Sequence, residues 1–160
     1  CALATDGERD HVHAGRPWAK SGVEAGLDFA GGVHFRHELA SLLLLDGPLR
    51  RILDGVEDPD LVRYLVLAHH GKLRMRVRGP DDTDPATLRG LEHGRVIPTP
   101  ALLGQPPGEL AVDLRPFDDG GQWSRTARHL VDRYGPFLLA YLETVVRMAD
   151  WRASAGRPLA

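Results

Sequence analysis

The sequence predicts a mostly α-helical domain with a small β-hairpin insertion. Several segments repeat apolar residues at helical spacing, and two short segments show the alternation that is typical of a strand. The chain has 160 residues, of which 42% are hydrophobic and 26% charged. This length and composition predict one soluble globular domain with a core of its own.

Composition excludes several classes of protein. The net charge of −2 argues against a strongly basic protein that coats nucleic acid. A single cysteine excludes an internal disulfide and fits a reducing, cytoplasmic compartment. No apolar run approaches the roughly 18 residues of a membrane-spanning helix. The first residue is Cys1 and not methionine, so we interpret the chain as a fragment or an excised domain.

The first predicted helix follows a loop-rich segment. Residues 1–34 carry glycines and small residues without a sustained period, whereas residues 35–45 place His37, Ala40 and Leu44 on one helical face. Asp46-Gly47-Pro48 should end this helix. A short helix is expected around residues 49–53.

The second predicted helix begins at Asp58-Pro59, where aspartate is a good N-cap and proline suits the first helical position. An apolar stripe follows, and the pair His69-His70 extends it at the far end. Gly71 is a plausible stop signal. Both imidazoles should therefore lie on the buried face, near the C-terminal end of the helix.

Two strands are expected in the middle of the chain. In residues 72–78, basic side chains alternate with apolar ones, and residues 109–114 alternate in the same way. We expect these segments to pair as a hairpin, with little regular structure in the Pro- and Gly-rich residues 79–108 between them.

The C-terminal part should contain two helices, at residues 122–134 and 137–153, separated by Gly135-Pro136. The inner face of the last helix is apolar, and Asp150 lies near the edge of that face. Its inner residues are Leu139, Leu142, Val146 and Ala149.

Three imidazoles and one carboxylate are the candidate metal ligands. Two adjacent histidines at the inner edge of a helix, His69 and His70, are hard to explain as ordinary core residues, and neutral imidazole is a common metal ligand. His37 also lies on an apolar face. Asp150 would need a metal or a buried cation as partner, because burial of an unpaired carboxylate costs several kcal/mol. Such ligands suit a divalent transition metal that activates water.

Other polar residues leave two interpretations open. Glu38 is expected either to support His37 from behind or to lie at the surface, and Ser154 either to bind substrate or to cap its helix. The basic row of the first strand either contacts phosphates or is a solvated face; it consists of Lys72, Arg74, Arg76 and Arg78. Five histidines are interpreted as structural or surface residues: His11, His13, His34, His93 and His129. We find no phosphate-binding glycine loop, dinucleotide fingerprint, nucleophile elbow or zinc-type cysteine pair.

Taken together, Arg36-His37-Glu38, Ala68-His69-His70-Gly71 and the segment Ala149-Asp150-Trp151-Arg152-Ala153-Ser154 resemble the HD nuclease domain of the CRISPR-associated helicase–nuclease of type I interference systems. The resemblance runs from about Trp18 to Ser154. It implies an HD-domain-like helical bundle over residues 35–154, with residues 155–160 as a tail.

The resemblance also implies a function. Domains of this family cut single-stranded DNA with one or two metal ions, and by analogy His37, His69 and His70 would bind one ion, Asp150 the other, and Ser154 would lie near the DNA. Manganese, iron, cobalt or nickel would suit the site. The implied partners are a helicase domain or subunit and the DNA-bound CRISPR surveillance complex, with no membrane.

The chain departs from the family in one respect. No histidine is followed by aspartate, so the His-Asp pair expected upstream of Arg36-His37-Glu38 is missing, and the catalytic residues beyond the metal-activated water are unassigned. Truncation is the simplest interpretation, and degeneration is the other. Two rival functions remain: an HD-family nucleotide phosphohydrolase, and a non-catalytic domain that docks a helicase.

Overall fold

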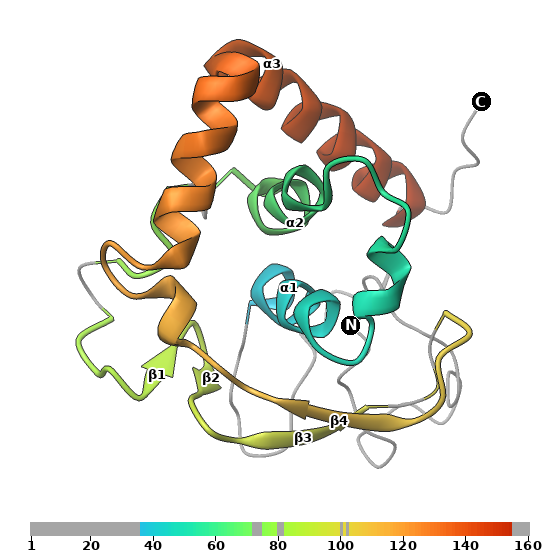
Figure 1. Cartoon of the computed structure of the whole chain (residues 1–160), viewed down its shortest axis with the longest axis vertical. Coiled ribbons are helices and arrows are strands. Elements are labelled where there is room, and N and C mark those ends of the chain that lie inside the picture. Colours follow the sequence, from blue (N-terminus) through green and yellow to red (C-terminus); the bar gives the residue numbers. More distant parts are fainter. Residues whose placement is uncertain (1–35, 72–74, 80–81, 100, 102, 155–160) are drawn as a thin grey trace.

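The computed structural model describes residues 36–71, 75–79, 82–99, 101 and 103–154. Within them, three α-helices surround a common core: α1 (His37–Asp46), α2 (Pro59–Ala68) and α3 (Gln122–Ser154). Helix α3 rises on one side, bends, and descends on the other, so that α2 lies under the bend and α1 beneath α2 (Figure 1). The predicted mostly α fold is confirmed. The predicted loop at residues 1–34 and the tail at 155–160 lie outside the described residues.

The start of α2 follows the capping rule read from the sequence. A side-chain oxygen of Asp58 accepts a hydrogen bond from the backbone N–H of Leu61 at 3.0 Å, and Pro59 occupies the first helical position. At the other end Gly71 has φ +74°, a conformation that favours glycine. The predicted short helix appears as a 3-10 turn, η1 (Arg50–Leu53).

Helix α3 consists of two helical halves joined at a kink. Gly135 has φ 74° and ψ 155°, which lies outside the helical region, and Pro136 follows it. A residue with a side chain adopts this conformation at a cost, so glycine permits the sharp change of direction. The interruption predicted at Gly135-Pro136 is confirmed.

The strands are shorter than predicted and pair differently. The structure has two antiparallel pairs, β1 (Thr87–Leu88) with β2 (Leu91–Glu92), and β3 (Val96–Thr99) with β4 (Gly108–Ala111). Strand β4 corresponds to the strand predicted at residues 109–114. Its partner comes from residues 79–108, which were expected to have little regular structure, so the predicted pairing with residues 72–78 is wrong.

Side-chain contacts, rather than a strand ladder, hold the described part of the basic segment. Residues 75–79 form no strand. Arg76 bonds the carboxylate of Asp119 at 2.7 Å, and Arg78 contacts Asp118 at 3.3 Å. Arg78 also donates to three backbone carbonyls, those of Asp84, Pro85 and Thr87. A guanidinium that makes these bonds stabilises a loop, and the alternation of basic and apolar residues in the sequence does not predict such contacts.

The core lies between the three helices and extends to the strands and to η2 (Arg115–Phe117). Tyr64 of α2 stacks on Trp123 at the start of α3, with ring centroids 6.2 Å apart. No helix among the described residues is both long and apolar enough to span a bilayer. The largest completely buried apolar side chains are Leu39, Leu42, Leu67, Leu88, Leu114, Leu130 and Leu139.

Candidate metal centre

Three histidines that are far apart in the sequence converge between α1 and α2. His37 lies in the first turn of α1, while His69 and His70 directly follow the last turn of α2. One ring nitrogen from each lies within 4.8 Å of the other two. The packing of α1 against α2 therefore brings together the three imidazoles that the sequence singled out, in a group that could hold a metal ion.

A backbone carbonyl fixes the tautomer of His69. Its Nδ1 lies 2.7 Å from the carbonyl oxygen of Val66. A carbonyl oxygen can only accept a hydrogen bond, so Nδ1 carries the proton and Nε2 of the neutral ring keeps its lone pair. A histidine held in this way is prepared to bind a metal through Nε2.

The ring nitrogens of His37 and His70 face each other. Their Nε2 atoms are 2.9 Å apart, and the two rings are perpendicular with centroids 4.8 Å apart. Two nitrogens at about 2.1 Å from one ion, with an angle of about 90–109° between the bonds, would be separated by roughly 3.0–3.4 Å. The two nitrogens are therefore close to the separation that one ion requires, and a bound ion would replace the hydrogen bond between them.

Glu38 lies behind His37. Its side chain is completely buried, and one carboxylate oxygen lies 3.6 Å from Nδ1 of His37 while the other lies 3.5 Å from the guanidinium of Arg36. Neither oxygen has a hydrogen bond among the described residues. The carboxylate favours a proton on Nδ1, and Nε2 would then be the atom of this ring that could bind a metal. Of the two interpretations of Glu38, surface exposure is wrong.

The backbone around the site also favours a cation. The C-terminal end of a helix carries a partial negative charge, and His69 and His70 stand at that end of α2. His37 stands at the partially positive end of α1, where the carboxylate of Glu38 in the first turn offsets this charge. The turn between β1 and β2 holds this end of α1, because the N–H of Arg36 donates to the carbonyl of Arg89 at 3.0 Å.

The site is buried on one side and open on the other. The side chain of His37 is 36% exposed, whereas His69 is 9% exposed and also receives a bond from α3, where Nε of Arg147 donates to its backbone carbonyl at 2.7 Å. The open side would let water and substrate reach an ion bound by these rings.

None of the other predicted site residues that the structure describes joins this group. Asp150 is half-buried on α3 and does not belong to the three-histidine group, so its role as a ligand stays a prediction. Ser154 ends α3, and its side chain lies outside the described residues. Lys72 and Arg74 also lie outside them, as do His11, His13 and His34. Arg76 and Arg78 are engaged with the carboxylates described above.

The two remaining histidines fit the structural or surface role expected of them. Nδ1 of His93 accepts a hydrogen bond from the backbone N–H of Leu114 at 3.1 Å, which braces the loop after β4. His129 is exposed on the first half of α3. Neither residue belongs to the metal-ligand group.

One buried carboxylate was not predicted from the sequence. Glu143 on α3 is only 2% exposed and accepts a hydrogen bond from the hydroxyl of Tyr64 at 2.7 Å. Glu143 stands four residues after Leu139 and so continues the inner row of the helix, a spacing that could have predicted its burial.

No protein-family model, curated protein or solved structure matches this chain.

Proposed function

We propose that this chain is a metal-dependent phosphodiesterase domain, a nuclease for single-stranded DNA of the type I CRISPR kind. The observation that carries the proposal is the convergence of His37, His69 and His70 within 4.8 Å of one another, with one side of the site open. A divalent transition metal bound there would lower the pKa of a coordinated water and supply a nucleophile for the phosphodiester.

The protein's own contribution would be to position the ligands. Nδ1 of His69 is bonded to the carbonyl of Val66, and Nδ1 of His37 lies 3.6 Å from the carboxylate of Glu38, so in both rings Nε2 would be the atom that binds the ion. Imidazole ligands favour iron and nickel over magnesium and calcium, and manganese and cobalt are the other two ions that the resemblance implies. A second ion would need further ligands, for which Asp150 is the candidate.

Metal binding is tested first, by equilibrium dialysis of the chain against Mn²⁺ or Co²⁺ with quantification of the bound metal. We expect one ion per chain, and loss of that ion in His69→Ala and in His70→Ala. His129→Ala is the matched control, because this exposed histidine lies outside the group. Equal metal binding by all four proteins would contradict the proposed site.

The reaction is tested with fluorescent single-stranded DNA, double-stranded DNA and a panel of nucleotides, each with Mn²⁺ and with excess chelator. We expect metal-dependent cleavage of single-stranded DNA that His69→Ala abolishes. Hydrolysis of nucleotides alone would favour the phosphohydrolase. Metal binding without any cleavage would reject the nuclease and favour a non-catalytic domain that docks a helicase.

A further inference from the structure

The second half of α3 is apolar on two opposite faces. One face, which includes the buried Leu139, packs into the core. The other carries six large hydrophobic side chains that are at least 44% exposed. A contiguous exposed apolar patch of this kind usually marks an interaction site. The six are Phe137, Leu138, Tyr141, Val145, Met148 and Trp151.

The spacing of the outer face is that of a helix–helix seam. Phe137, Tyr141, Met148 and Trp151, with Thr144 in the middle, are separated by steps of four and three residues in alternation. This is the heptad spacing with which one helix packs against another. All five positions are exposed. The occupant of this face should therefore itself be a helix with an apolar stripe.

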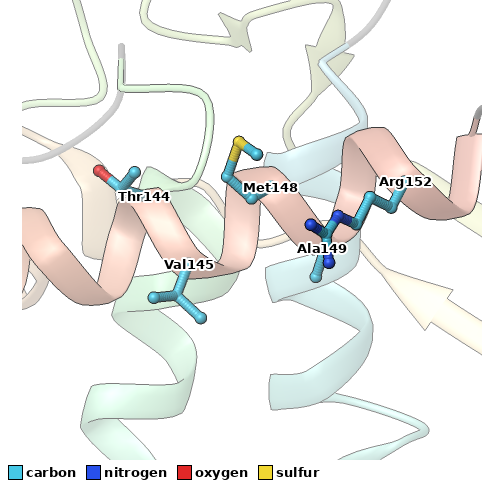
Figure 2. Close-up of a pocket in the computed structure, with 5 residues that line it drawn as sticks. All are labelled: Thr144, Val145, Met148, Ala149 and Arg152. Carbon is cyan, nitrogen blue, oxygen red and sulfur yellow. The ribbon is translucent and has the colours of Figure 1, made fainter. Parts of the chain in front are cut away.

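An open apolar groove follows the same part of α3, lined by Thr144, Val145, Met148, Ala149 and Arg152 (Figure 2). Among these lining residues only Arg152 carries a charge, and it stands near the C-terminal end of the stripe. Two copies packed in parallel would place their Arg152 side chains together. Two antiparallel copies would place them about 20 Å apart, at opposite ends, where salt screens them from each other.

We propose that this outer face of α3 is the interface of a homodimer, in which two copies pack antiparallel about a two-fold axis near Thr144. The aromatic Phe137 end of one copy then lies toward the Trp151 end of the other, so the stripe is complementary to itself, as an isologous interface requires. From its exposed fractions, the stripe offers roughly 600 Å² of apolar surface per chain. If the whole stripe is covered in the dimer, two copies bury about 1,200 Å², which reaches the lower bound for a specific interface.

The test is the molar mass of the whole chain in solution, measured by light scattering after gel filtration and by sedimentation equilibrium between about 1 and 100 μM. We expect twice the chain mass of 17.6 kDa. Tyr141→Glu and Val145→Glu should each give the mass of one chain, since they place a charge on the exposed apolar face at positions that are 64% and 47% exposed. Arg128→Glu, an exposed change on the first half of α3, should leave the dimer intact.

A monomer at 100 μM would overturn the proposal. A dimer that persists in both glutamate variants would overturn it as well, because the contact would then lie elsewhere. Circular dichroism of each variant confirms that the helices are retained. The measurement is made without metal and with no DNA, so its outcome does not depend on the proposed nuclease activity.

Discussion

Replacing Glu38 by glutamine should weaken metal binding while it stabilises the metal-free fold. The carboxylate is completely buried, has no hydrogen bond among the described residues, and lies 3.6 Å from Nδ1 of His37. Burial of a charge with so few partners costs free energy, and a neutral amide of the same shape costs less. The same charge polarises and orients the ring of His37, and the amide would do so less well.

The separation of the two atoms sets the size of the effect. Two unit charges 3.6 Å apart attract each other by about 5 kcal/mol at an effective dielectric constant of about 20. The N–H end of a metal-bound imidazole carries only a fraction of a charge, so roughly a third of this energy, about 1.5 kcal/mol, depends on the carboxylate. That corresponds to a loss of about tenfold in metal affinity, within the 10- to 100-fold range known for groups behind a metal ligand.

The assay is isothermal titration of Mn²⁺ or Co²⁺ into the wild-type chain, Glu38→Gln and the control Glu109→Gln, whose glutamate is exposed on β4. A thermal melt of each metal-free protein accompanies it. We expect a tenfold weaker affinity together with a melting temperature that is unchanged or a few degrees higher. An affinity within twofold of wild type would refute the orienting role, and a lower melting temperature would refute the argument from the buried charge.

Three further changes test the scaffold. Asp58→Ala should cost about 1 kcal/mol of stability, because it removes the N-cap of α2. Burial raises the pKa of Asp58, but the bonds from Tyr134 and from the backbone N–H of Leu61 and the charge of Arg133 together lower it below 3.8. Chemical denaturation should therefore show that the stability contributed by the Asp58 carboxylate is complete above about pH 4 and is lost as the pH falls through the lowered pKa. Gly135→Ala should cost about 1–3 kcal/mol in the same assay, because φ 74° with ψ 155° is strained for any residue with a Cβ; no loss would mean that the kink relaxes. Arg147→Ala removes the bond to the carbonyl of His69 and should lower both stability and metal affinity. A metal affinity equal to that of the wild type would show that the C-terminal end of α2 keeps its position without this bond.

The helices could be predicted because local chemistry defines their ends. Asp58-Pro59 and Gly135-Pro136 act within a few residues of their own positions, so the sequence predicts where α2 begins and where α3 bends. The strands could not be predicted in the same way. The alternation in residues 72–78 looks like a strand, yet Arg76 and Arg78 bind acidic residues some 40 positions away, a contact that no local period contains.

The members of the three-histidine group could be predicted from the sequence, but the residues around it were harder to predict. Each histidine lies on an apolar helical face, which indicated that His37, His69 and His70 point inward, and the packing of α1 on α2 brings them together. Glu38 was ambiguous because its neighbour His37 was already assigned to the inner face, whereas in the structure Glu38 is the more deeply buried of the two. The bond from Tyr64 to Glu143 joins residues 79 positions apart, which places it beyond any local pattern.

Helix α2 is fastened to α3 at both of its ends. At its start, Asp58 accepts bonds from Tyr134 and Arg133, just before the kink of α3; at its end, the carbonyl of His69 accepts a bond from Arg147, well after the kink. Contacts with both halves of α3 therefore limit the movement of α2 along its own axis. The positions of His69 and His70 relative to α1 would thus be fixed before an ion binds, so little conformational entropy would be lost on binding.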